Sequence, residues 1–118
     1  MVGTEHHEAV VEYRVRAQFV VNQLPAFYEV LTDGTVANQK PDGAEIVSSM
    51  KQAKIVAPNT IEWFETCYCP SPLKHERETV YDKYLVNFET LPVKKRDEIE
   101  GDSFWSFLQN HSKTQFNK

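Results

Sequence analysis

The clearest pattern in the chain is an alternation of apolar and polar residues between Val10 and Val21. Its apolar positions are Val11, Tyr13, Val15, Ala17, Phe19 and Val21, and the polar positions between them include Glu12, Arg14, Arg16 and Gln18. A period of two is typical of a strand with one buried and one solvent-facing side, which occurs mostly in antiparallel sheets. We expect this strand well inside such a sheet, with Arg14 and Arg16 facing outward in cross-strand ion pairs.

The pattern changes to a helical one from about Gly43 to Lys54. Asp42 is a favourable N-cap, and Glu45 completes a variant of the capping box three residues later. The apolar stripe of this predicted helix consists of Ile46, Val47, Met50 and Ala53. These positions fall on one face of a helix, so we expect that face to pack on the sheet.

Residues 24–38 allow two interpretations. Asp33-Gly34 is a strong hairpin signal, which favours a strand over 27–31 and a short returning strand over 35–38. Alternatively, residues 24–31 form a helix with Pro25 in its first turn, where proline is well tolerated.

A further strand is predicted over Thr60–Cys69, because β-formers occupy both of its faces and Pro70 follows. From Ser71 to Glu89 an apolar stripe favours a helix, with Ser71 as N-cap and Pro72 in the first turn. A helix that gives way to a strand near 85–91 also fits this segment.

Residues 92–102 read as a charged surface connection. Asp102 or Ser103 is expected to cap a short terminal helix, followed by a polar tail from Gln109. These elements together predict a single α+β domain over 1–118. We expect an antiparallel sheet of about four strands, two or three helices packed mainly on one face, and flexible ends at 1–8 and 110–118.

Composition narrows the classes of function. Apolar residues make up 41% of the 118, enough for one core, and the net charge is −4. The basic residues do not cluster, which argues against nucleic-acid binding. No stretch has the length of a membrane span and no signal-peptide pattern opens the chain, so we expect a cytoplasmic protein without a membrane partner. Two cysteines are too few for a disulfide scaffold.

Those cysteines, Cys67 and Cys69, form a C-x-C-x5-H pattern with His75. Residues i and i+2 share a face of a strand, so both sulfurs are expected to be neighbours. A reactive thiol is one interpretation, because Lys74 or His75 beside a thiol lowers its pKa. A metal site is another, and its fourth ligand would come from Glu76, His6, His7 or His111. The leading interpretation is that both cysteines are buried as small apolar residues.

The polar run from Lys74 to Glu78 offers a second candidate site. On a helix His75 and Glu78 share a face, and an imidazole beside a carboxylate is the minimal set for acid–base catalysis. The leading interpretation is a solvated first turn in which Glu76 and Glu78 favour the helix N-terminus, since short charged runs of this kind are usually on the surface.

No phosphate-loop, dinucleotide-binding, nucleophile-elbow or zincin motif occurs in the chain, and we expect no cofactor. Aromatic residues are abundant at 12%, and Phe104-Trp105 is the pair most suited to an interface. The sequence therefore favours a non-enzymatic binding or interaction domain that self-associates and has an unidentified protein or small-molecule ligand. A small enzyme that uses Cys67, Cys69, His75, Glu76 or Glu78, or a metal-binding module, is the alternative.

Overall fold

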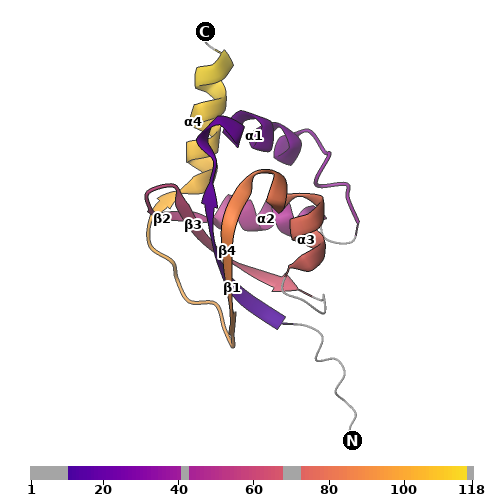
Figure 1. The fold of residues 1–118 in the computed structure, drawn as a ribbon, viewed down its shortest axis with the longest axis vertical. Helices are drawn as coiled ribbons and strands as arrows, with labels where there is room; N and C mark the ends of the chain where they lie inside the picture. Colours follow the sequence, from indigo (N-terminus) through magenta and orange to yellow (C-terminus); the bar gives the residue numbers. More distant parts are fainter. Residues whose placement is uncertain (1–10, 41–42, 68–72, 117–118) are drawn as a thin grey trace, which may run out of the picture.

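The computed structural model describes residues 11–40, 43–67 and 73–116. They form an α+β fold around one five-stranded antiparallel sheet in the order β4-β1-β3-β2-β5 (Figure 1). The strands are β1 (Val11–Phe19), β2 (Lys54–Ala57), β3 (Thr60–Cys67), β4 (Leu85–Val93) and β5 (Asp102–Ser103). This confirms the predicted fold class. The sheet is wider than expected because β2 and β5 are too short to show an alternating pattern.

Helices occupy the segments between these strands. They are α1 (Leu24–Thr32), α2 (Gly43–Gln52), α3 (Lys74–Thr79) and α4 (Phe104–Phe116), with 3-10 turns η2 (Val21–Gln23) and η3 (Tyr81–Lys83). The predicted helix over 43–54 is confirmed as α2. Its predicted N-cap, Asp42, lies outside the described residues.

The sheet has two unlike faces because β1 alternates strictly. Tyr13, Val15, Ala17 and Phe19 are buried on what we call the inner face. That face meets the buried residues of α1, α2 and α4, which include Leu24, Phe27, Ile46, Met50, Phe104 and Leu108. The opposite side, called the outer face, carries Arg14 and Arg16 of β1. As predicted, β1 lies inside the sheet, between β3 and β4.

The hairpin predicted at Asp33-Gly34 is wrong, and the helical alternative is confirmed by α1. Pro25 lies in the first turn, and Leu24, Phe27 and Leu31 are buried on one side of the helix. Asp33 is the C-cap of α1, and its side chain accepts a hydrogen bond from the backbone N–H of Thr35 at 2.8 Å. Asp-Gly therefore ends a helix here, because burial of three large side chains outweighs the local turn preference.

The continuous helix favoured for 71–89 is also wrong, and the helix followed by a strand is confirmed. Helix α3 spans only Lys74–Thr79, η3 follows, and β4 begins at Leu85. The β-forming residues Val86 and Phe88 end up in the strand that suits them. Ser71 and Pro72, predicted to start the helix, lie outside the described residues.

At the C-terminal helix the predicted cap is confirmed. The Oγ atom of Ser103 accepts a hydrogen bond from the backbone N–H of Ser106 at 3.1 Å. Helix α4 then continues to Phe116, well beyond the point where a polar tail was expected. In Figure 1 this helix projects from the end of the sheet.

Residues 94–101, called the strap, join the two edges of the sheet. The strap leaves β4 at one edge and reaches β5 at the other, so it must pass β1, β3 and β2 (Figure 1). Gly101 closes this connection with φ +149°, and a Cβ atom at this position would collide with the backbone oxygen of Ile55 in β2. Only glycine fits this backbone conformation and close approach.

We therefore predict that Gly101→Ala lowers the free energy of unfolding by about 2 to 4 kcal/mol, because the strap must shift away from β2. Gly34→Ala is the matched control. It also has a positive φ, of +96°, but its added Cβ would meet only the movable side chain of Asn38 at 3.2 Å. Chemical denaturation of both variants checks this, and equal losses would contradict it.

Candidate functional site

The outer face of β3, β1 and β4 holds the main charged cluster of the sheet. Register places Arg16 between Glu62 of β3 and Glu89 of β4. The same register places Arg14 between Phe64 of β3 and Leu91 of β4. The strict alternation of β1 thus aligns a row of guanidinium groups with carboxylates and apolar side chains on both sides.

Glu62 is the centre of this cluster. Its Oε1 atom accepts hydrogen bonds from Arg14 Nε at 3.0 Å and Nη2 at 2.6 Å, and its Oε2 atom lies 3.3 Å from Arg16 Nε. The two arginines shield the carboxylate, whose side chain is only 11% exposed. The predicted cross-strand ion pairs of Arg14 and Arg16 are therefore confirmed, and both involve one glutamate.

Glu89 behaves differently from Glu62. It lies directly opposite Arg16 in the ladder and is exposed, yet it makes no ion pair with any described residue. Together with Arg14, Arg16 and Leu91 it lines a shallow hollow of ≈ 340 Å³. The outer face therefore carries the Glu89 carboxylate beside Arg16, whose guanidinium group is directed to Glu62 and not to Glu89.

The strap is fixed to one end of this face by Arg96. Arg96 Nε lies 2.8 Å from Glu12 Oε1 of β1, and Nη2 donates to Thr66 Oγ1 of β3 at 3.1 Å. The hydrogen bonds of Arg96 and Thr66 lower the pKa of Glu12, although burial opposes them as the largest single influence. Glu45 of α2 lies 3.7 Å from Arg96. The outer face is thus partly covered at this end.

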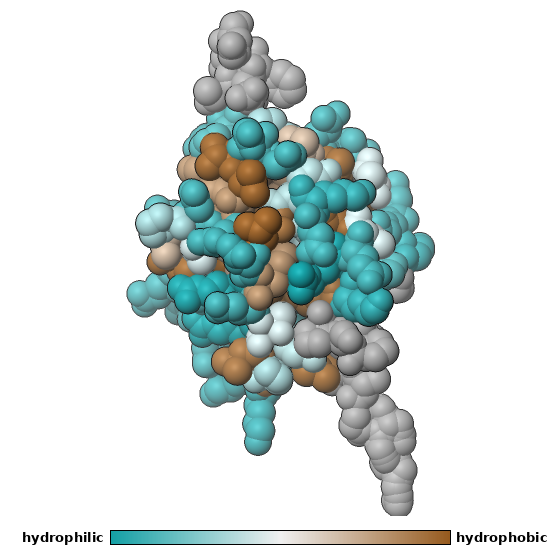
Figure 2. Space-filling view, in the orientation of Figure 1, coloured by the Kyte–Doolittle hydropathy of each residue, from teal (hydrophilic) through white to brown (hydrophobic). Residues whose placement is uncertain are grey.

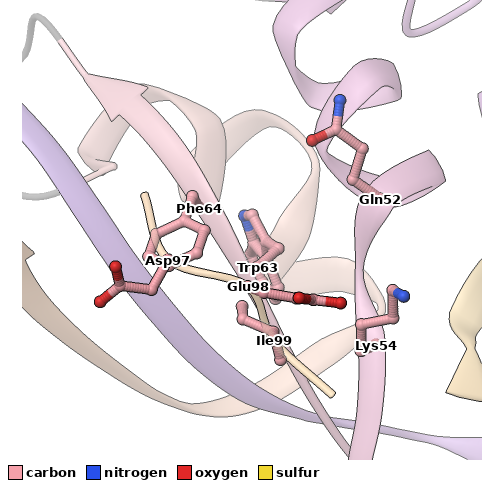
Figure 3. A pocket seen from close by; sticks show the side chains of 7 residues that line it. All are labelled: Gln52, Lys54, Trp63, Phe64, Asp97, Glu98 and Ile99. Carbon is pink, nitrogen blue, oxygen red and sulfur yellow. The ribbon is translucent and has the colours of Figure 1, made fainter. Parts of the chain in front are cut away.

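A second hollow, of ≈ 270 Å³, lies where the strap passes β3. Figure 3 shows the carboxylate of Glu98 pointing toward Lys54, while Asp97 points away from it. Ile99 is buried at this point and Phe64 forms part of the lining. Asp97 and Glu98 are exposed, so the hollow offers charged groups at its rim and an apolar floor.

On the inner face, a carboxylic acid is enclosed in the core. Glu65 is 0% exposed, and its Oε1 atom accepts hydrogen bonds from Trp63 Nε1 and the Tyr81 hydroxyl, both at 2.7 Å. Its buried Oε2 atom has no hydrogen-bond partner among the described residues. Burial raises the pKa of Glu65 to about 8, against the two hydrogen bonds that lower it. Glu65 therefore carries its proton at neutral pH.

Two neighbours strengthen this effect. The negative charges of Glu76 and Glu45 also raise the pKa of Glu65. Burial, followed by the charge of Glu65, raises the pKa of Tyr81 well above its ordinary value. A substrate does not reach Glu65, because its side chain is completely buried. We interpret the Glu65–Tyr81 contact as the polar link that holds η3 to the sheet.

The three residues of α3 predicted for catalysis, His75, Glu76 and Glu78, differ in their exposure to solvent. Glu76 is 2% exposed, so the solvated first turn expected for it is wrong: α3 turns this carboxylate toward the core. Glu78 is exposed and pairs with Lys74 at 2.8 Å, and this hydrogen bond lowers its pKa. His75 is half-buried on the same helix.

The thiol part of the prediction is not tested. Cys67 ends β3 opposite Val11, while its side chain and all of Cys69 lie outside the described part of the chain. No group of three metal-ligating side chains occurs among the residues that the structure describes. The proposed cysteine and histidine set, and His6 and His7 with it, therefore remain predictions.

The aromatic pair predicted for an interface is divided between core and surface. Phe104 is completely buried and stacks on Phe19, with ring centroids 5.4 Å apart. Trp105 is half-buried, 5.7 Å from the ring of Tyr28, with the Lys51 ammonium 5.5 Å above its own ring. A role in association for either residue is not tested by these contacts within one chain.

Sequence reasoning missed Glu65, Tyr81 and Glu89. Glu65 had a signal, because the alternation of β3 places it on the same face as Ile61 and Trp63. A carboxylate on such a face predicts either a buried acid or a break in the pattern. Tyr81 and Glu89 had none, since their roles depend on how η3 and β4 fold back on the sheet.

Comparisons with protein-family models, curated proteins and solved structures give no match. None of the described helices is long and apolar enough to span a membrane.

The buried acid predicts a specific pH dependence. The folded protein retains the Glu65 proton up to about pH 8, whereas the unfolded chain releases it near 4.5. Its contribution to stability is thus complete below about 4.5 and declines as the pH rises to about 8, by on the order of 4 kcal/mol. Glu65→Gln cannot ionise and should remove this part of the decline.

Denaturant titrations of both proteins between about pH 5 and pH 9 measure this effect. Tyr81→Phe is the matched control, because it removes one hydrogen bond but keeps the acid and therefore the decline. Parallel pH profiles for the wild type and Glu65→Gln would contradict the assignment.

Proposed function

We propose that this chain is a small, cytosolic, non-enzymatic interaction domain that self-associates through the outer face of its sheet. The observation that carries the proposal is the contrast between the two faces. The inner face is covered by helices, whereas the outer face presents charged and apolar side chains on β1 and β4. Leu91 is 60% and Val86 44% exposed there.

The charge of this face selects the class of partner. Its strands present Glu12, Arg14, Arg16, Glu62 and Glu89, and Arg96 of the strap adds a third guanidinium group. On β1, β3 and β4, together with Arg96, three positive and three negative groups balance. Lys54 of β2, on the same side of the sheet, is accompanied by Asp97 and Glu98 of the strap, so the face lacks the basic surface that nucleic acids and anionic membranes require. Such a balanced, mixed surface suits another protein surface with the same property, and a second copy meets that condition.

The apolar residues support a protein partner as well. Figure 2 shows separate hydrophobic patches among hydrophilic residues over the visible side of the molecule, and on the outer face the exposed apolar residues are Val86 and Leu91. Interfaces that form and dissociate resemble the remaining surface in their overall polarity. We therefore expect a reversible association that depends on protein concentration rather than a permanent dimer.

Sedimentation velocity over a concentration series tests this proposal. The wild type should shift from monomer toward dimer at concentrations up to about 1 mM. Leu91→Glu should raise the dissociation constant at least about tenfold, because it removes exposed apolar area from the interface and adds a charge. Val21→Glu is the control, since Val21 is 45% exposed but lies in η2, beyond the end of β1.

A wild type that stays monomeric throughout the series would overturn the proposal. Equal effects of the two variants would show that association uses another surface.

A further inference from the structure

We propose that the second copy packs on the outer face around a two-fold axis that runs parallel to the strands, between β1 and β4. In this arrangement Arg16 of each copy pairs with Glu89 of the other. The inference rests on the self-association proposed above and adds its geometry. Its basis is the position of these two residues directly opposite each other in the β1–β4 ladder.

The symmetry follows from the ladder itself. A two-fold axis parallel to the strands and midway between β1 and β4 places β1 of one copy over β4 of the other without a shift along the strands. Every outer-face register pair then recurs between the copies. Arg16 lies over Glu89, Arg14 over Leu91 and Gln18 over Val86. Opposite charges thus meet twice, Leu91 faces the alkyl stem of Arg14, and Val86 faces Gln18.

Glu89 is suited to this contact because it is exposed and its carboxylate is not bonded by a guanidinium or ammonium group of the described segments. Arg16 directs its Nε atom to Glu62 Oε2 at 3.3 Å, and its side chain remains 47% exposed. Glu89 makes no ion pair with any residue of the described segments, although it lines the same hollow as Arg16. The Glu89 carboxylate can therefore pair with the exposed side of the Arg16 guanidinium group of a second copy. By symmetry, Arg16 pairs with Glu89 of that copy.

Two other parallel axes fit less well. An axis along β1 itself would place the arginines of one copy on those of the other, which is repulsive. An axis between β1 and β3 would place Arg16 over Glu62, but Glu62 is 11% exposed and already bonded by two guanidinium groups. The strap also passes the outer side of β3 near Phe64 (Figure 3).

Pairing along the free edge of β4 is disfavoured by the strand itself. Pro92 has no N–H to donate, and the register with β1 shifts near Asn87, whose φ is +58°. A proline and a bulge are the devices by which edge strands avoid adding a further strand. The partner is therefore expected on the face and not on the edge.

Charge reversal with mixing tests the geometry. Arg16→Glu and Glu89→Arg each place like charges across the two-fold axis, so each variant alone should bind itself at least about tenfold more weakly than the wild type. An equimolar mixture should restore association to within about threefold of the wild type, because both contacts between positions 16 and 89 in the mixed dimer join an arginine to a glutamate. The double variant R16E/E89R should be restored in the same way.

Lys40→Glu and Glu29→Arg are controls with the same changes in net charge at exposed positions away from the outer face. Neither control should weaken association. Should R16E fold poorly beside Glu62, Glu89→Arg keeps the test valid, because it leaves the contact between Arg16 and Glu62 intact and must by itself weaken self-association when neither control does.

The outcomes separate the two proposals. Restoration in the mixture and in the double variant supports the two-fold geometry. A wild type that self-associates, with variants that mixing does not restore, overturns the geometry and leaves the proposed function standing. A wild type without self-association overturns both.

Discussion

The structure depends on one constraint: β1 alternates so strictly that it can bury only one of its sides. Val15 and Ala17 are fully buried against the helices, which forces Arg14 and Arg16 to the opposite face of the sheet. A slip of one residue in register would bring both guanidinium groups into the core, at a cost far above the stability of a small domain. The same pattern that forms the core therefore creates a charged surface without a helical cover.

The inner face includes one polar exception, and it stabilises the segment before β4. Glu65 is protonated at neutral pH because burial raises its pKa to about 8. Trp63 and Tyr81 both donate hydrogen bonds to one of its oxygens. The contact between Glu65 and Tyr81 connects η3 to the middle strand of the sheet. It positions the start of β4, and thereby the side of the outer face on which Glu89 and Leu91 lie. The buried acid is thus a structural element that supports the proposed interface.

The sequence predicted those elements whose patterns are long and local. β1 and α2 each carry a clear period, β3 is rich in β-forming residues on both faces, and Ser103 is a recognisable cap. The errors occurred where a short local signal competed with tertiary burial: Asp33-Gly34 resembles a hairpin turn but ends α1. For the candidate site, Arg14 and Arg16 were predictable from alternation. Their link to Glu62, and the lack of an ion pair for Glu89 within the described segments, depend on pairing between strands distant in sequence, which no local pattern specifies.

Self-association through the outer face of the sheet is tested most directly by backbone amide chemical shifts recorded over a dilution series. These shifts report on the contact residue by residue. We expect concentration-dependent shifts along β1 and β4, strongest near Arg16, Glu89 and Leu91, and constant shifts in α1 and α2. Shifts centred on Trp105 and the neighbouring helices, or spectra that do not change with concentration, would contradict this assignment.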